Sequence, residues 1–334
     1  MQSSKEKSVI ETIPWYLVSG FGAHIKATPR ILIVQKRGCT EEIPLSAIRH
    51  LLVMGGHTLH TSVVSRLLSA GCAVSFFEAD GEPLGFLRPY GFQYDENVRE
   101  AQVRAFPHSP ALAIAKGSAH ARILYLVRLQ EDLDHPLFYE GELEVLEKSV
   151  SELDYLVRLE EVRRVHRLIS DMYYEILART IPADLGFRRR TSRPHTDVVN
   201  TLLSFGYGLL FGNMCVAVIG AHLDPEIGFL TRGKAGLVHD LCDPFRPAMI
   251  DDPVCSFVRE GLLPGGFECG PDRCILSDEL VHSLLQRLVR TIRQDIIDSH
   301  VLSLRESLMK KTDFIIHIPE PHSFNGTHDR KVSE

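Results

Sequence analysis

Two aspartates in the segment LTRGKAGLVHDLCDPFRP (residues 230–247) have a spacing that allows shared chemistry. Asp240 and Asp243 lie three residues apart and follow a short basic stretch that contains glycine. If the segment opens a helix, the two carboxylates lie about one turn apart on the same face. Such a pair could form half of a metal site for phosphodiester chemistry. The alternative is the acidic first turn of an ordinary helix, which the helix dipole stabilises.

A local basic cluster precedes a long apolar segment. Its members fall within six residues and are Arg188, Arg189, Arg190 and Arg193. One interpretation is a solvated loop, and the other is a contact with nucleic-acid phosphates. The formal net charge of −6 argues against a protein that coats nucleic acid by bulk charge, but it leaves room for a local basic patch.

The composition is typical of a globular protein. The chain has 334 residues, enough for two domains, with 44% hydrophobic residues and a mean hydropathy of −0.01. We expect no membrane span and no signal peptide, and therefore a cytoplasmic location. The seven cysteines include no CxxC pair, which favours a reduced chain. A bridge between Cys269 and Cys274, across a Gly-Pro turn, is the less favoured alternative.

Two regions must position these candidate residues. Residues 1–92 contain runs rich in Val, Ile and Phe. Turn-forming residues, including the dipeptides Arg37-Gly38 and Asp80-Gly81, lie at the ends of these runs. One short helix is expected over 60–71. We predict a small antiparallel β domain there. The polar stretch 93–100 is the expected linker. Residues 101–318 carry long segments of period near 3.6 and predict an all-α domain, and 319–334 are expected to be a flexible tail. The fold class is therefore α+β.

Several stretches together resemble one family. GGHTLHTSVVSRLLSAGCAVSFFEADGEPLGFL (55–87) is similar to the end of the amino-terminal β domain of the CRISPR-associated integrase, the larger of the two universal spacer-acquisition proteins. The stretch that begins RRRTSRPHTDVVNTLLSFGYG and ends DLCDPFRP (188–247) is similar to that family's signature block. The similarity covers most of residues 50–250 in the right order, so it is far more specific than a single short motif.

The resemblance implies an activity and its partners. It implies a homodimer formed through the β domains, a helical domain with a Mg²⁺ or Mn²⁺ site, and a small ferredoxin-like partner protein. The implied reaction is DNA integration, in which a prespacer 3′-hydroxyl attacks a phosphodiester at the CRISPR repeat boundary, and the implied ligands are prespacer, repeat and branched DNA. The resemblance also places the arginine cluster, Asn200, Ser204 and Tyr207 along the DNA, while Arg246 either holds a phosphate or pairs with Asp243.

The family's metal ligands are only partly present. Asp240 and Asp243 match its two acids, but Thr231 stands where the family has a histidine after Gly-Phe-Leu, and a hydroxyl is a poor substitute for imidazole. The family's glutamate lies seven residues before an aromatic pair, and here His166 lies seven before Tyr173. Glu160 and Glu161 would reach that position only after a shift in helix register, and Glu175 lies about 180° away on the opposite face of the helix.

Three hypotheses follow from this altered ligand set. In the first, the protein keeps the fold, the dimer and the DNA surface, and its catalysis is weak or absent. In the second, His166, Asp240 and Asp243 hold one divalent ion and the protein is a fully active endonuclease-integrase. In the third, it is a purely structural subunit that pairs with a competent paralogue. Asp240 and Asp243 are the candidate catalytic residues in the second.

Overall fold

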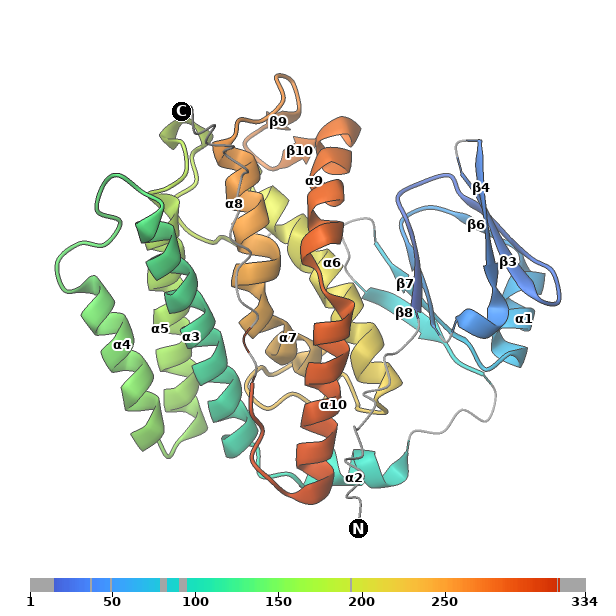
Figure 1. Cartoon of the computed structure of the whole chain (residues 1–334), viewed down its shortest axis with the longest axis horizontal. Coiled ribbons are helices and arrows are strands. Elements are labelled where there is room, and N and C mark those ends of the chain that lie inside the picture. The colour runs from blue at the N-terminus through green and yellow to red at the C-terminus, as the bar shows by residue number, and fades with distance from the viewer. Residues whose placement is uncertain are drawn as a thin grey trace, which may run out of the picture.

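A β-strand region is followed by a mostly helical region, so the α+β class is confirmed (Figure 1). The computed structural model describes residues 15–36, 38–48, 50–78, 83–89, 95–192, 194–316 and 318. The dipeptides Arg37-Gly38 and Asp80-Gly81, predicted as turns, lie partly or wholly outside the described residues, and so does the predicted tail 319–334.

The β region contains two four-stranded sheets. One sheet has the order β1-β5-β7-β8, with β1 Trp15–Ser19, β5 His50–Met54, β7 Ala73–Phe77 and β8 Pro83–Leu87. The other has the order β4-β3-β2-β6, with β2 His24–Ala27, β3 Ile31–Lys36, β4 Cys39–Pro44 and β6 Thr58–Leu59; a 3₁₀ turn, η1 Leu45–Ala47, follows β4.

The prediction that the β domain is antiparallel was wrong for part of it. Strand β5 pairs in parallel with both β1 and β7, and only β7–β8 is antiparallel in that sheet. The expected short helix, α1 Thr61–Ser69, lies in the connection between β5 and β7. A parallel pair needs such a crossover, because a tight hairpin can only join antiparallel strands. Val63 and Leu67 of α1 are fully buried among the strands.

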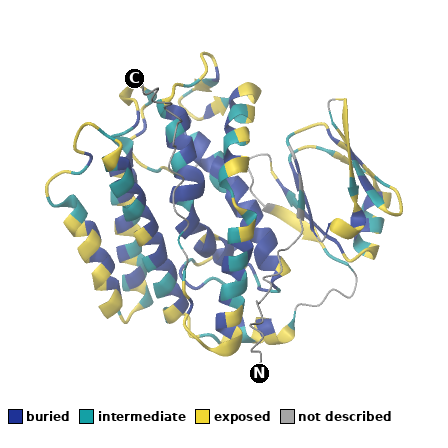
Figure 2. Ribbon diagram, viewed as in Figure 1, coloured by how far each residue is buried: buried dark blue, intermediate teal, exposed yellow. Residues whose placement is uncertain are grey.

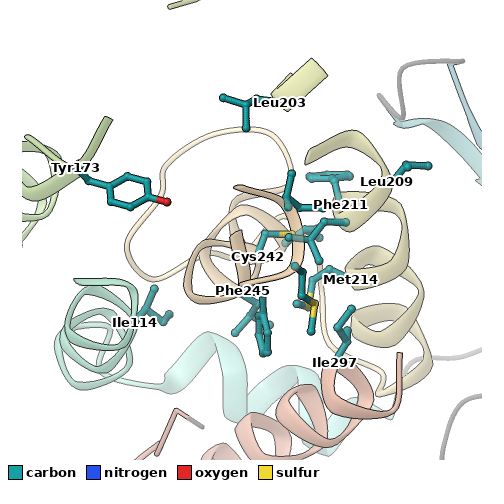
Figure 3. Packing of buried hydrophobic residues seen from close by; sticks show 14 of the residues in the cluster. Ile114, Tyr173, Leu203, Leu209, Phe211, Met214, Cys242, Phe245 and Ile297 are labelled. Atoms are coloured by element: carbon teal, nitrogen blue, oxygen red, sulfur yellow. The ribbon is translucent and has the colours of Figure 1, made fainter. Parts of the chain in front are cut away.

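The helical region is built around one central helix, α6 Val198–Gly220 (Figure 1). Its other α-helices are α2 Glu96–Arg104, α3 His108–Glu131, α4 Glu142–Glu152, α5 Leu159–Ala178, α7 Gly236–Cys242, α8 Asp252–Arg259, α9 Asp278–Thr291 and α10 Gln294–Lys310. Short turns connect them: η2 Leu153–Tyr155, η3 Ala183–Leu185, η4 Asp243–Phe245 and the π-helical turn η5 Pro247–Asp251. Figure 3 shows Phe211 and Met214 of α6 packed near Cys242, Phe245 and Ile297 from three other elements.

Helix α6 corrects the expectation that no apolar run is long enough to cross a bilayer. Its 23 residues are long and apolar enough to cross a membrane by length and composition alone, with a mean hydropathy of 1.8 over its most apolar 18-residue window. However, 89% of that window is buried inside the fold, and Figure 2 shows α6 as mostly buried. A helix that is apolar on all sides is typical of a core helix enclosed by others. We therefore interpret α6 as the centre of the helical core.

Two further elements differ from simple sequence expectations. Residues 96–100 of the predicted linker form the first half of α2, which begins where the Asp95 side chain accepts a hydrogen bond from Asn97 N–H and which buries Val98. The strands β9 Phe267–Cys269 and β10 Cys274–Leu276 form a hairpin that a Cys269–Cys274 disulfide closes. The expectation of a fully reduced chain is therefore wrong at this hairpin, because the turn brings the two cysteines to paired positions.

Candidate functional site

The candidate site lies where α3, α5 and η4 meet. The buried residues of α3 at this point, Ala115, Gly117, Ser118 and Ala119, are all small and let neighbouring elements approach closely. Ser118 and His166 of α5 both reach Asp243, the first residue of η4. Asp243 is 5% exposed, so whatever contacts its carboxylate does so inside the protein.

Asp243 is enclosed by hydrogen-bond donors. Its Oδ1 accepts from Arg122 Nη2 at 2.9 Å and from Arg246 Nη1 at 2.7 Å. Its Oδ2 accepts from the same Arg122 atom at 3.0 Å, from the Ser118 hydroxyl, and lies 2.8 Å from His166 Nε2. Burial by itself raises the pKa of this carboxyl, but Arg122, Arg246 and His166 hold its pKa well below the ordinary range. Asp243 is therefore a carboxylate whose charge is already compensated.

The sequence analysis missed Arg122. This side chain is 1% exposed and projects from α3 between Asp243 and the ring of Tyr173, whose centroid is 5.7 Å from the guanidinium carbon. Burial lowers the pKa of Arg122, but Asp243 and, to a smaller extent, Tyr174 and Tyr173 together raise it above its ordinary value, so the group stays cationic. The available signal was that Arg122 directly precedes the apolar run Ile123–Val127 of α3, since a buried arginine requires an anionic partner.

Asp240 has a different task from Asp243. Its Oδ2 accepts from Phe229 N–H at 2.7 Å and from Leu230 N–H at 2.9 Å, and its Oδ1 accepts from Thr231 N–H at 2.7 Å. Burial raises the pKa of Asp240, although these hydrogen bonds lower it. The carboxylate therefore caps the 229–231 turn, and its lone pairs are used by the backbone of its own chain.

The same turn is also held from the other side. Arg163 of α5 donates from Nε to Leu230 O at 2.5 Å and from Nη2 to Phe229 O at 3.4 Å. The turn is thus fixed between a carboxylate that accepts from its N–H groups and a guanidinium that donates to its carbonyls. Thr231, which stands in place of the family's histidine, lies in this turn.

The predicted metal ligands do not form one cluster. His166 and Asp243 are in contact, but the Asp240 carboxylate is bonded to the 229–231 turn, and among the described residues no three His, Cys, Asp or Glu side chains are arranged to hold a metal ion. Mg²⁺ and Mn²⁺ need several anionic or neutral oxygen donors, and here two guanidinium groups contact the one shared carboxylate. These residues do not fit a resident divalent ion in this arrangement.

The arginine cluster divides into exposed and anchored members. Arg188 and Arg189 are exposed, and Arg193 lies outside the described residues. Arg190 is anchored: its Nη1 donates to Asn200 Oδ1 at 2.5 Å and its Nη2 to Ser204 Oγ at 2.7 Å. Arg188 and Arg189 are therefore the described members of the cluster that are free to meet a phosphate.

Asn200 is buried and does not line a surface. It is 1% exposed, and its amide nitrogen donates to Asp197 Oδ2 at 2.8 Å and to Arg189 O at 3.0 Å. Asp197 in turn caps α6 by accepting from Asn200 N–H. Asn200 thus ties the arginine loop to the start of α6, and its effect on any bound nucleic acid would be indirect.

Tyr207 connects the arginine loop to the Asp243 cluster. The guanidinium carbons of Arg190 and Arg246 lie 5.1 and 4.9 Å from the centroid of its ring. Its hydroxyl donates to Asp251 Oδ1 at 2.5 Å and lies 2.7 Å from the hydroxyl of Tyr174. Burial raises the pKa of Tyr207 well above its ordinary value, so the hydroxyl remains a donor. Asp251 and Tyr174 are further members of this network that the sequence analysis missed.

A hollow of about 360 Å³ lies beside the arginine loop. Its lining joins that loop to one face of α5 and consists of Asp171, Tyr174, Glu175, Arg189, Arg190, Thr191 and Ser192. The lining carries both signs of charge, so it is a polar surface and not an apolar ligand pocket.

Sequence comparison decides the family. The family model described as CRISPR associated protein Cas1 matches residues 16–290. A putative CRISPR-associated endonuclease Cas1 2 from Methanospirillum hungatei is 41% identical over 300 residues, which cover 90% of this chain and 99% of that protein. The chain belongs to the Cas1 family. A second Cas1 relative, a CRISPR-associated endonuclease Cas1 1 from Thermus thermophilus, is 30% identical over 284 residues, or 84% of this chain and 86% of that one.

Solved structures show the same fold. A CAS1 protein from Thermotoga maritima superposes with a TM-score of 0.75 at 18% identity, covering 91% of this chain and all of that one. A casposase bound to its integration product superposes with a TM-score of 0.77 at 18% identity, covering 93% of this chain and 95% of that one. The predicted resemblance to spacer-acquisition integrases is therefore confirmed at the level of family and fold. Among the residues that the structure describes, this Cas1 member shows no group of three potential metal ligands.

Proposed function

We propose that this Cas1 protein binds DNA during spacer acquisition and that its own metal-dependent strand transfer is weak or absent. One observation carries the second half of the proposal: the Asp243 carboxylate is compensated by Arg122 and Arg246 and has no lone-pair direction left for a divalent ion. Strand transfer of this kind needs a metal to stabilise charge on the attacking and leaving oxygens. A carboxylate that is already bound by two arginines does not bind that metal.

DNA is the proposed ligand because of family membership and local charge. Arg188 and Arg189 are exposed, and Arg189 lines the mixed-charge hollow, in a chain whose net charge is −6. Such a local basic patch attracts backbone phosphates without coating the whole protein. A solved structure of similar fold is a casposase bound to an integration product, which supports DNA as the ligand of this surface.

The proposed assembly follows the same family. We propose a homodimer that forms through the β region, with residues 1–92 as the dimerisation domain and 101–318 as the DNA-binding domain, acting in the cytoplasm. A small ferredoxin-like protein is the proposed partner. A structure titled Cas6-RT-Cas1–Cas2 complex superposes on 92% of this chain with a TM-score of 0.78, which supports an assembly of more than one kind of protein.

Two other functions make different predictions. In the first, His166, Asp240 and Asp243 rearrange around Mg²⁺ or Mn²⁺ when DNA binds, and the protein is a complete integrase-endonuclease. In the second, the chain only pairs with a competent paralogue. The 2.8 Å contact between His166 and Asp243 is the observation that favours the first alternative, because both side chains could become metal ligands.

A strand-transfer assay separates these functions. The protein is incubated with a labelled prespacer duplex, a repeat-containing target and branched DNA, with Mn²⁺, with Mg²⁺ or with a chelator. We expect DNA binding that weakens steeply with salt and no product above the level seen with Asp243→Asn. Products that require Mn²⁺ and disappear in Asp240→Ala would support the active enzyme instead. Absence of DNA binding even at low salt would support the structural subunit.

A further inference from the structure

The order in which groups are buried around Asp243 is the reverse of what a metal site needs. The side chains of Arg122 and Asp243 are 1% and 7% exposed, whereas those of Arg246 and His166 are 25% and 19% exposed. A ligand that arrives from solvent therefore meets a guanidinium and an imidazole before it can reach the carboxylate. This edge of the cluster favours an anion and repels a cation.

Arg246 has donor capacity left over for such an anion. The Nη1 atom of Arg246 donates to Asp243 at 2.7 Å, and the guanidinium of Arg246 packs on the ring of Tyr207. Among the described residues, no acceptor lies within hydrogen-bond distance of the buried Nε of Arg246. Asp251, a second carboxyl whose charge interacts with Arg122 and Arg246, accepts its hydrogen bonds from Tyr173 and Tyr207 instead. The guanidinium is thus oriented by one carboxylate and one ring.

His166 is oriented in the same way. Its Nε2 lies 2.8 Å from Asp243 Oδ2 and 3.3 Å from the Ser118 hydroxyl, which turns the other ring nitrogen away from the cluster centre. Arg163 lies one helix turn before it on α5 and is 20% exposed, and Arg167 follows it and is exposed. Arg163 therefore shares the face of α5 that carries His166, whereas Arg167 points to a neighbouring face.

We propose that the cluster of Arg122, Asp243, Arg246 and His166 is a phosphate site that works without a divalent ion. Buried Arg122 supplies the permanent positive charge that balances Asp243, and Arg246 with His166 receives one backbone phosphate of the bound nucleic acid. This inference rests on the proposed function, since it names the chemistry by which the altered centre holds DNA. A guanidinium suits that task because its planar N–H groups match two oxygens of one phosphate.

Histidine NMR on the full-length protein, in whichever oligomeric state it has in solution, tests the site directly. The protein is labelled with ¹⁵N-histidine, and the His166 signal is identified among the 16 histidines by its loss in His166→Gln. Titration with inorganic phosphate is expected to shift the His166 signal, and the shift should be lost in Arg246→Gln. Titration with Mn²⁺ should leave the signal sharp. Selective broadening by Mn²⁺, or a phosphate response equal in wild type and Arg246→Gln, would overturn the proposal.

DNA binding provides a second measurement on the same site. The affinity for a prespacer duplex is measured by fluorescence anisotropy over a series of salt concentrations, with Mg²⁺ or with a chelator at matched ionic strength. Removing one phosphate contact reduces the slope of log K against log salt by about 1. We expect that reduction for Arg246→Gln and an affinity that the chelator leaves unchanged within about twofold. An affinity that falls tenfold in the chelator would contradict a metal-independent site.

A matched substitution controls for the general loss of charge. Arg104→Gln removes an exposed arginine of α2 that pairs with Glu100, outside the cluster. It should leave both the salt slope and the His166 phosphate response as in wild type. The outcomes also separate this inference from the proposed function. Strand transfer together with a phosphate response would refute only the proposed loss of catalysis. Intact DNA binding without any His166 response would refute only the phosphate site.

Discussion

The Nη2 atom of Arg122 lies 2.9 Å from Oδ1 and 3.0 Å from Oδ2 of Asp243, in a site where both side chains are almost completely buried. The two residues are 121 positions apart in the chain. Their contact places a fixed organic cation on the carboxylate that the family pattern assigns to a metal ion. It therefore explains how the fold can keep Asp243 ionised and buried without a bound metal.

Removing Arg122 should destabilise the protein strongly. Arg122→Met leaves Asp243 buried with less compensation, and breaking a buried ion pair from one side typically costs about 3–5 kcal/mol. The measurement is the free energy of unfolding from urea titration, followed by fluorescence. The double variant Arg122→Met/Asp243→Asn should recover a large part of that loss, because the uncompensated charge is gone. A loss below about 1 kcal/mol in the single variant would show that the pair is not important for stability.

Restoring the family's ligand types should restore metal binding only if Arg122 is also removed. His166→Glu with Thr231→His supplies the two side-chain types that the family pattern has at these positions. With Arg122 present, we expect calorimetry to show no Mn²⁺ uptake, since the guanidinium still competes for Asp243. With Arg122→Ala added, we expect measurable uptake. Equal Mn²⁺ binding by both variants would mean that Arg122 does not exclude the metal.

Stability of the β region should fall as the solution becomes mildly acidic. His50 of β5 is buried, its Nε2 lies 2.7 Å from Ser75 Oγ, and burial, with a smaller effect of Arg88, lowers its pKa to about 4. Because the unfolded state takes up this proton near the ordinary histidine pKa of about 6.5, the stabilisation is fully present above that pH and is lost as pH falls toward 4. The full shift corresponds to about 3 kcal/mol.

The measurement for His50 is the free energy of unfolding at pH 7.5 and pH 5.0 in wild type and His50→Gln. Other histidines with a lowered pKa, such as His57 and His239, contribute equally to both proteins. The wild type should therefore lose more stability than the variant between the two pH values. Identical losses would show that His50 does not carry this dependence.

The hairpin disulfide predicts a specific thiol count. With seven cysteines and one Cys269–Cys274 bond, the denatured but unreduced protein should expose 7 − 2 = 5 thiols to a thiol reagent. Closing such a short loop stabilises the fold by about 2 kcal/mol in the chain-entropy view, so reductant should lower the melting temperature of wild type but not of Cys269→Ser/Cys274→Ser. A count of seven thiols in protein purified without reductant would contradict the bond.

The sequence by itself determined much of the architecture. Alternating and helical periodicity separated a β region from a helical one, and the signature block from Arg188 to Pro247 identified the family, because such long ordered patterns survive where single residues change. It also predicted that His166 and Thr231 replace two of the family's metal ligands. It did not show that β1, β5 and β7 run in parallel, since strand direction depends on crossover geometry and not on side-chain alternation.

Only the tertiary structure decided what the altered centre does. Asp240 and Asp243 look equivalent in the sequence, yet one caps the turn at residues 229–231 and the other receives Arg122 and Arg246. Burial makes each hydrogen bond and each charge count more, so the partners that reach a carboxylate set its role. Those partners come from distant helices, and no local pattern of spacing contains them.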